Sequence, residues 1–216
     1  MTKNILDSDK RRVIALQTEV IQREQFFLAG GTGLGVRLRH RVSRDIDWFT
    51  AKPFDATRVA QALAALPEKP TDVTVQGPHT LRAYYGSLET SFIRYTQVTA
   101  RPEVLTAGRL KIPVADLETL ALMKAAALHD RGTQRDFVDI HAICAAPGWS
   151  VARFIDLATT RLPFAPVQIK LALTYFEDAD RLALPIDYSV SWKQVKADLQ
   201  QGVQQWERSR DRGLER

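Results

Sequence analysis

The segment from residue 28 to residue 49 limits what this chain can fold into more than any other part of the sequence. It reads LAGGTGLGVRLRHRVSRDIDWF. Short apolar runs with aromatic residues occur at 26–29 and again at 46–49, and such runs are typical of buried strands. Gly30, Gly31 and Thr32 interrupt the first run, and apolar residues recur at 34, 36 and 38. We therefore expect a strand, a glycine turn into a helix, and a second strand.

Two common glycine motifs are excluded by the residues around them. A dinucleotide-binding fingerprint, G-x-G-x-x-G, would begin at Gly31 and Gly33 and require a third glycine where the chain has Val36. A P-loop requires lysine and then serine or threonine after its last glycine, whereas Val36 and Arg37 follow Gly35. Neither motif explains the glycines.

Two aspartates after the expected helix indicate which ligands this segment could bind. Glycines let a backbone approach phosphates closely, and a helix N-terminus offers unpaired N–H groups to anions. Asp45 and Asp47 are two residues apart on the expected second strand, so their side chains would share one face, opposite Ile46 and Trp48. Two carboxylates and the substrate phosphates together can bind a hard divalent cation. Such a cation would stabilise a displacement at phosphorus.

The rest of the sequence divides into a mixed half and a helical half. In the first half we expect helices at 8–23, capped by Ser8 or Asp9, and at 55–65, and strands near 72–75, 81–85 and 88–95. From residue 114 onward the expected elements are helices, at 116–129, 136–145, 150–162, 167–176 and 191–212. We predict an α+β protein, with an α/β core of residues 1–113 and a helical part of residues 114–216.

Composition excludes several classes of protein. The 216 residues include 30 Lys and Arg against 25 Asp and Glu; the net charge of +5 suits a polyanionic partner but identifies none. The single cysteine, Cys144, excludes an internal disulfide and is expected to be a small core residue. The polar N-terminal segment is unlike a signal peptide, and no apolar run has the length of a membrane helix. We expect a cytoplasmic protein without a membrane partner.

This arrangement resembles the nucleotidyltransferase superfamily with the polymerase-β-like fold, and within it the AbiEii/AbiGii toxin family of nucleotidyltransferases. Two sequence blocks within about residues 10–145 carry the resemblance. The first contains Leu28, Gly30, Gly31, Thr32, Leu34, His40, Arg41, Ser43, Asp45, Ile46, Asp47 and Phe49. The second contains Asp116, Leu117, Met123, Lys124, Ala127, Arg131, Arg135, Asp136 and Asp139.

The resemblance implies a mixed sheet flanked by helices, with the nucleotide bound in the first block. Gly30, Gly31 and Thr32 would cradle the phosphates. Asp45 and Asp47 would be catalytic ligands of Mg²⁺, or of Mn²⁺ in its place. The first block would further supply two residues that contact the triphosphate or brace the loop, Arg41 and Ser43.

In the second block, the resemblance implies that Lys124 binds the nucleotide and neutralises phosphate charge. Asp136 would assist catalysis, and Asp139 would do so or support the site structurally. The residues themselves leave simpler interpretations open. Lys124 could extend from a core helix to solvent, and the two aspartates could pair with Arg131 or Arg135 or cap the following helix.

A third carboxylate, which the wider superfamily often supplies from a later strand, has no clear counterpart. The equivalent position on the expected strand 88–95 is Ser91, and Glu89 lies two residues earlier on the same face. If neither Ser91 nor Glu89 takes the role of the third carboxylate, Asp136 acts as the base or the reaction uses one metal ion.

The function implied by the resemblance is metal-dependent transfer of NMP from an NTP to an acceptor hydroxyl. The protein would be the toxin of a toxin–antitoxin or phage-defence system, with a cognate antitoxin protein as its partner. The implied acceptor is RNA, at the 3′ end of tRNA, and Arg101, Arg109 and Lys111 are candidates for lining its path. Two alternatives stay open: a non-catalytic nucleotide- or RNA-binding module on the same fold, and an enzyme that transfers AMP or another NMP to protein.

Overall fold

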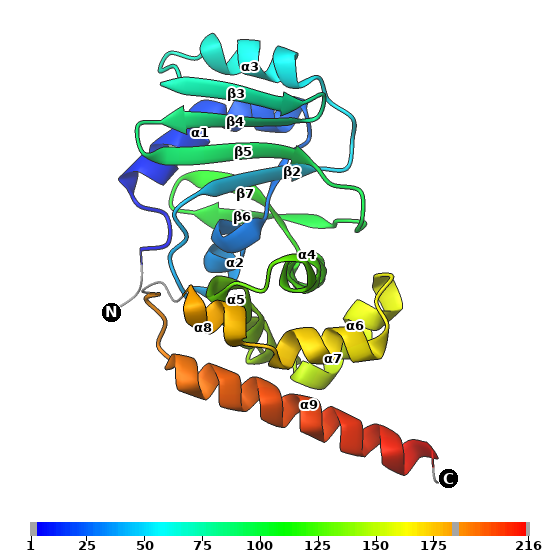
Figure 1. The fold of residues 1–216 in the computed structure, drawn as a ribbon. Helices are drawn as coiled ribbons and strands as arrows, with labels where there is room; N and C mark the ends of the chain where they lie inside the picture. The colour runs from blue at the N-terminus through cyan, green and yellow to red at the C-terminus, as the bar shows by residue number, and fades with distance from the viewer. Residues whose placement is uncertain (1–3, 183–185, 215–216) are drawn as a thin grey trace. The chain divides into compact units, whose positions relative to one another are not determined.

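The computed structural model describes residues 4–182 and 186–214, and the chain forms two compact units, Met1–Leu120 and Ala121–Arg216 (Figure 1). The first unit contains a sheet with helices. In its described residues, the second unit contains helices alone. This is the α+β architecture expected from the sequence. The predicted division after residue 113 falls inside a strand, β7 (Leu110–Ala115).

The sheet of the first unit has seven strands in the order β3-β4-β5-β2-β1-β7-β6. Two neighbouring pairs, β2 with β5 and β1 with β7, are parallel, and the other pairs are antiparallel. The sheet is therefore mixed, as predicted. The strands besides β7 are β1 (Phe27–Leu28), β2 (Ile46–Thr50), β3 (Asp72–Gly77), β4 (Thr80–Tyr85), β5 (Leu88–Arg94) and β6 (Pro102–Ala107).

Helix α1 (Ser8–Arg23) covers one face of this sheet. Its buried Gln17 accepts a 2.9 Å hydrogen bond from the indole N–H of Trp48 and donates one of 3.2 Å to Thr90. The predicted span of the helix is confirmed, but its cap is Asp7, one residue before the predicted pair. Asp7 accepts a hydrogen bond from the backbone N–H of Lys10, the usual way an acidic residue caps a helix start.

Helix α3 (Ala56–Ala64) lies by the β3 edge of the sheet, and its predicted cap, Asp55, is confirmed by hydrogen bonds from the N–H groups of Thr57 and Arg58. The strands expected near 72–75, 81–85 and 88–95 are confirmed as β3, β4 and β5. The alternation predicted for β2 is also confirmed, because Ile46 and Trp48 are fully buried in the core.

The hairpin of β6 and β7 was not predicted. The sequence pattern predicted no element at residues 102–115. Both strands contain a proline, Pro102 in β6 and Pro113 in β7, and prolines within a run argue against a strand. Here Pro102 begins a strand at the edge of the sheet, where proline is tolerated.

The helices of the second half begin with α4 (Leu117–Asp130), which starts in the first unit and continues into the second. The predicted cap of α6, Ser150, is confirmed, whereas the short α8 was not predicted. The apolar stripe predicted for the last helix is confirmed, since Val195, Leu199, Val203 and Trp206 are all buried. The remaining helices are α5 (Gln134–Cys144), α6 (Val151–Arg161), α7 (Pro166–Thr174), α8 (Glu177–Arg181) and α9 (Trp192–Leu214).

Among the described residues, no helix combines the length and the apolar character that crossing a membrane requires.

Candidate active site

The glycine turn follows β1 directly and begins helix α2 (Gly30–Leu38). Gly30 has φ +58°, a left-handed conformation that side chains rarely adopt. A Cβ atom at Gly30 would lie 2.4 Å from a carboxylate oxygen of Asp47, Oδ2. The adjacent Ala29 donates its backbone N–H to the carbonyl of Asp47 at 3.0 Å. The first turn of α2 therefore stands against the Asp47 side chain, and glycine at position 30 makes this approach possible.

Gly31 makes a second close approach, to the loop that leads into β2. A Cβ atom there would lie 2.7 Å from a guanidinium nitrogen of Arg41 and 2.7 Å from the hydroxyl oxygen of Ser43. Arg41 is buried, and its guanidinium donates a 3.3 Å hydrogen bond to the carbonyl of Val42. The two residues predicted to contact the triphosphate or brace the loop thus lie beside the helix start, where a bound anion would be placed.

Thr32 holds the first aspartate in place. Its side chain is fully buried, and its hydroxyl donates a hydrogen bond to the carbonyl of Asp45. Asp45 itself lies one residue before β2, and both Asp45 and Asp47 are partly exposed. Because the Thr32 hydroxyl is engaged in this way, the Thr32 group available to a phosphate is its backbone N–H at the helix N-terminus.

Ser91 occupies the position at which a third carboxylate was sought. Strands β2 and β5 are parallel, with Asp47 opposite Ser91. The Ser91 hydroxyl donates a 2.6 Å hydrogen bond to Oδ1 of Asp47. Glu89 instead forms a 3.3 Å ion pair with Arg82 of β4. The side chain that contacts Asp47 from β5 is therefore Ser91, whereas Glu89 is paired with Arg82.

These residues fit a divalent cation that is bound partly by its substrate. In residues 4–182 and 186–214, no group of three or more His, Cys, Asp or Glu side chains is arranged to hold a metal. Mg²⁺ does not require such a group, because it often binds through one or two carboxylates together with substrate phosphates and water. Asp45 and Asp47, next to a helix N-terminus, form a donor set of this kind.

The basic run that precedes the aspartates is only partly available to a ligand. The guanidinium of Arg37 donates to the carbonyls of Ala115 and Val114 in β7 and forms a 3.0 Å ion pair with Glu103. It therefore attaches α2 to the β6–β7 hairpin. Arg39 and Arg44 have exposed side chains. The contacts of Arg37 are thus structural.

The second sequence block forms a buried charge cluster inside the second unit. The ammonium nitrogen of Lys124, on α4, lies 2.9 Å from Asp136 and 2.7 Å from Asp139, both on α5. Lys124 is 6% exposed, and the two aspartates are fully buried. Asp136 also accepts hydrogen bonds from the guanidinium of Arg131, at 3.0 and 3.1 Å, and from the hydroxyl of Thr133, at 2.6 Å.

These contacts fix the protonation states of the cluster. Burial alone would raise the pKa of Asp136, but Lys124, Arg131 and Thr133 outweigh it and hold that pKa well below its usual range. Burial would likewise lower the pKa of Lys124, yet the charges of Asp139 and Asp136 raise it. An Asp136 carboxylate this acidic is a poor proton acceptor. The cluster therefore favours a structural role for Asp136, the interpretation in which it pairs with Arg131 and caps a helix.

Pairing with Arg131 was among the interpretations that the sequence left open, whereas Thr133 was assigned no role, although a signal was present. Thr133 is the N-cap of α5, and Asp136 stands three residues later, the spacing of a capping box. The predicted site residues thus form two groups. The glycine turn, Arg41, Ser43, Asp45 and Asp47 come together in the first unit, and Lys124, Asp136 and Asp139 come together in the second.

Solved structures of other proteins share this fold, among them a nucleotidyltransferase toxin. The nucleotidyltransferase toxin MenT4 from Mycobacterium tuberculosis is 16% identical, with a TM-score of 0.63 over 92% of this chain and 81% of MenT4. JHP933 from Helicobacter pylori is 17% identical, with a TM-score of 0.56 over 96% of this chain and 94% of JHP933.

Sequence comparison identifies the family. The family model of the nucleotidyl transferase AbiEii toxin, of type IV toxin–antitoxin systems, matches residues 14–212, and the chain belongs to this family. The resemblance stated from the sequence is confirmed. The uncharacterized protein aq_aa25 of Aquifex aeolicus (strain VF5) is 30% identical over 185 residues, which are 84% of this chain and 87% of that protein. Family membership supports an enzyme over a non-catalytic binding module.

Proposed function

We propose that this nucleotidyltransferase transfers NMP from an NTP to an acceptor hydroxyl at the site formed by Gly30, Asp45 and Asp47. The observation that carries the proposal is the approach of Gly30 to Asp47, where a Cβ atom would lie 2.4 Å from the carboxylate. It brings a helix N-terminus, which attracts phosphate, against a carboxylate suited to a divalent cation. Phosphates and cation would therefore share one site.

In the proposed reaction, the acceptor oxygen forms a bond to the α-phosphorus of the NTP. The bond between that phosphorus and the oxygen leading to the β-phosphate breaks, pyrophosphate leaves with its electron pair, and the proton of the acceptor hydroxyl passes to solvent. The N–H groups at the start of α2 bind the phosphates, and Arg41 adds positive charge beside Gly31. Asp45 and Asp47 would hold Mg²⁺, or Mn²⁺, which when bound supplies positive charge to the phosphates and the leaving group.

Within the second unit, we propose that Asp136 and Asp139 position Lys124. The lysine has two buried carboxylate partners, at 2.9 and 2.7 Å, which restrict its ammonium group to one place. A lysine fixed in this way can present a point charge to a phosphate without reorganising.

We further propose that the acceptor is RNA, with the 3′ end of tRNA as the first candidate. The protein would act as a toxin, in phage defence or otherwise, that a cognate antitoxin protein counteracts in the cytoplasm. The net charge of +5 supports a polyanionic acceptor. Membership of a type IV toxin family supports the toxin role.

The test is label transfer from each of the four α-³²P-labelled NTPs to total RNA in the presence of Mg²⁺. Asp45→Asn and Asp47→Asn should each abolish transfer while the melting temperature stays near that of the wild type. Asp72→Asn, an exposed aspartate at the start of β3 in the same sheet, is the matched control and should keep full activity.

Transfer retained in either site variant would overturn this assignment of the site. Label appearing in protein and absent from RNA would instead identify an enzyme that modifies protein. Calorimetry that finds tight NTP binding without transfer to RNA or protein would indicate a non-catalytic module. The toxin role predicts that expression arrests bacterial growth and that Asp47→Asn relieves the arrest.

A further inference from the structure

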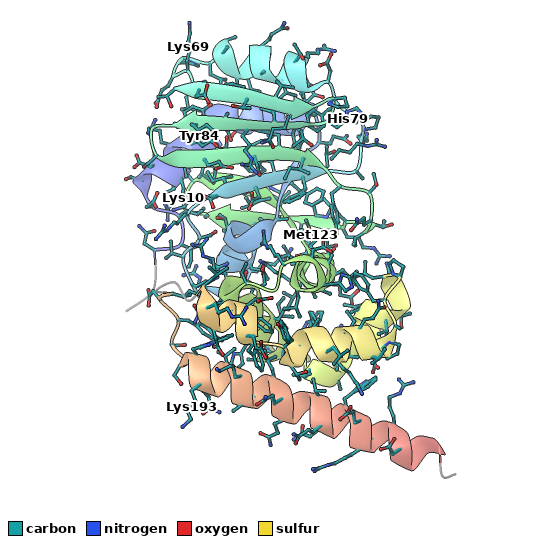
Figure 2. All side chains as sticks on the ribbon, in the orientation of Figure 1. Lys10, Lys69, His79, Tyr84, Met123 and Lys193 are labelled. Atoms are coloured by element: carbon teal, nitrogen blue, oxygen red, sulfur yellow. The ribbon has the colours of Figure 1, made fainter. Side chains whose placement is uncertain are left out.

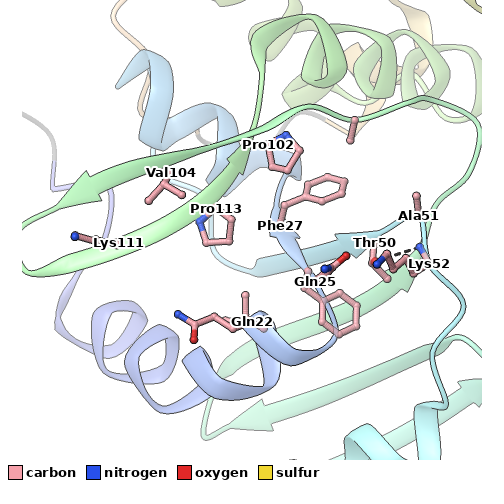
Figure 3. A pocket seen from close by; sticks show the side chains of 13 residues that line it. Gln22, Gln25, Phe27, Thr50, Ala51, Lys52, Pro102, Val104, Lys111 and Pro113 are labelled. Carbon is pink, nitrogen blue, oxygen red and sulfur yellow. Dashed lines mark hydrogen bonds between the residues drawn. The ribbon is translucent and has the colours of Figure 1, made fainter.

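The first unit contains a pocket of about 580 Å³ (Figure 3). It is formed by the end of α1, by β1, by the end of β2 and by the β6–β7 hairpin, and 13 residues line it. The volume lies within the range of pockets that bind small ligands. None of the residues proposed to bind the NTP or the metal ion lines this pocket, so it is a separate cavity.

The lining of the pocket combines apolar and basic groups. Its apolar part includes Phe27, Pro102, Val104 and Pro113, and Val104 is 66% exposed. Four exposed polar residues complete it, and among the lining residues that the structure describes none is acidic. Apolar surfaces accept the flat faces of nucleobases, amides bind base edges, and lysines bind phosphates. The four polar residues are Gln22, Gln25, Lys52 and Lys111.

Gln25 has an unusual backbone for its residue type. It lies just after α1 with φ 55°, in the left-handed region that favours glycine. Glycine is the common residue at such a position after a helix, because it adopts this conformation without strain. The chain instead has an exposed amide side chain at the wall of the pocket (Figure 3). Strained residues of this kind often serve a binding site.

Part of the pocket's lining lies on the same face of the sheet as the Asp47 carboxylate, and the rest belongs to the end of α1 on the other face. Phe27 is opposite Phe49 in the antiparallel pair of β1 and β2, and Phe49 is two residues from Asp47. Because side chains alternate along a strand, Phe27, Phe49 and Asp47 point the same way. At about 3.3 Å per residue, Phe49 lies roughly 7 Å from Asp47 along β2, and the lining residue Phe27 lies about 5 Å further, on the neighbouring strand. A short stretch of single-stranded nucleic acid can span that distance.

We propose that this pocket binds a nucleobase of the single-stranded RNA acceptor, close to the end that is modified at Asp47. The choice of RNA as the ligand rests on the proposed function. The binding itself is inferred from the residues that line the pocket. Charge complementarity supports this occupant, since two lysines and no acid line the pocket. Lys111, one of the residues expected from the sequence to line an RNA path, is among them.

The test measures RNA binding apart from catalysis. Fluorescence anisotropy gives the affinity for a labelled single-stranded RNA ending in a free 3′ hydroxyl, and a 4-thiouridine in the same RNA is cross-linked and mapped by mass spectrometry. Lys111→Glu should weaken binding at least about tenfold at low salt. Lys69→Glu is the control, because Lys69 is exposed beside α3 at the opposite side of the sheet (Figure 2). It should change the affinity less than about twofold.

Gln25→Gly separates binding from folding. Glycine suits the left-handed backbone, so the melting temperature should equal or exceed that of the wild type. Loss of the amide should nonetheless weaken RNA binding about threefold or more. A purely structural role for Gln25 predicts no loss of affinity.

The cross-link should map to peptides containing Phe27 or Pro113. RNA affinity equal to that of the wild type in Lys111→Glu and Gln25→Gly, or a cross-link elsewhere, would overturn the proposal even if NMP transfer occurs. Pocket cross-linking without any NMP transfer would support the pocket and contradict the proposed function. If the wild type bound no RNA measurably, the pocket proposal would be overturned. A protein ligand would then be the alternative occupant of the pocket.

Discussion

Ser91 donates its hydroxyl to Asp47 across two parallel strands, at 2.6 Å, where a third carboxylate would otherwise complete the acidic site. The serine thus orients one oxygen of Asp47 without adding negative charge. With two carboxylates in place of three, like-charge repulsion at the site is smaller before a cation binds.

Replacing this serine by aspartate should therefore make stability depend on metal. Without a divalent cation, Ser91→Asp should destabilise the protein by about 1–2 kcal/mol, because two carboxylates would face each other. With Mg²⁺ or Mn²⁺, the melting temperature of Ser91→Asp should rise more than that of the wild type. Ser87→Asp, on the exposed turn before β5, is the control and should show no such response. Equal metal responses in the wild type and Ser91→Asp would contradict a metal site at Asp47.

Gly30 should tolerate no side chain, for two separable reasons. Gly30→Ala carries the cost of a left-handed backbone, about 1 kcal/mol, and also forces Cβ against Asp47. Gly86→Ala carries only the first cost, because Gly86 has φ +63° and nothing lies within 4 Å of its Cβ position. In urea unfolding, Gly30→Ala should lose more free energy than Gly86→Ala, and it alone should lose NMP transfer. Equal losses in both would mean that the contact with Asp47 is unimportant.

The sequence predicted the parts of the site that neighbouring elements create. Gly30 and Asp47 meet because a strand, a turn and a helix lead directly into the next strand, and the glycine and aspartate spacing contains that information. The contact of Ser91 with Asp47 depends on β5 pairing with β2, which are far apart in the chain. Spacing along the sequence placed Ser91 and Glu89 on one face of a strand, but it could not show which of them contacts Asp47.

The β6–β7 hairpin and the charge cluster were harder to predict for a different reason. The hairpin contains two prolines and several charged residues, and the position of β6 at the sheet edge, where Pro102 is tolerated, is a property of the whole fold. For Asp136, pairing with Arg131 and helix capping were open alternatives, and the structure contains both. The burial of Lys124 between two aspartates follows from the packing of α4 and α5, which no local pattern specifies.

Cys144, which is partly exposed, should react slowly in the folded protein. Burial raises the pKa of its thiol to about 12, so little thiolate is present near neutral pH. Alkylation by iodoacetamide at pH 8 should be markedly slower than for a free thiol, whose ordinary pKa is about 8.5. Mass spectrometry of timed samples measures the rate, and the same protein in denaturant is the control. Equally rapid alkylation in both would contradict the burial of the thiol.

Lys124 should be essential to the stability of the second unit. Lys124→Met leaves Asp136 and Asp139 buried with one fewer cation, which should cost about 3–5 kcal/mol in urea unfolding. Lys196→Met removes a more exposed pair with Asp180 and should cost less than about 1 kcal/mol.

The pH dependence of the free energy of unfolding should distinguish the contribution of Asp136 from that of Lys124. The folded pKa of Asp136 is lowered, so its stabilisation is full above the unfolded value of about 3.9 and is lost as the pH falls below it. The folded pKa of Lys124 is raised, so its stabilisation is full below about 10.4 and is lost as the pH rises through the folded value. In Lys124→Met, the alkaline loss from this group should disappear, and the acid loss should shrink because Asp136 is less strongly held in its charged form. Chemical denaturation of both proteins from pH 3 to pH 11 measures these slopes, and parallel curves would contradict the coupling of Lys124 to the aspartates.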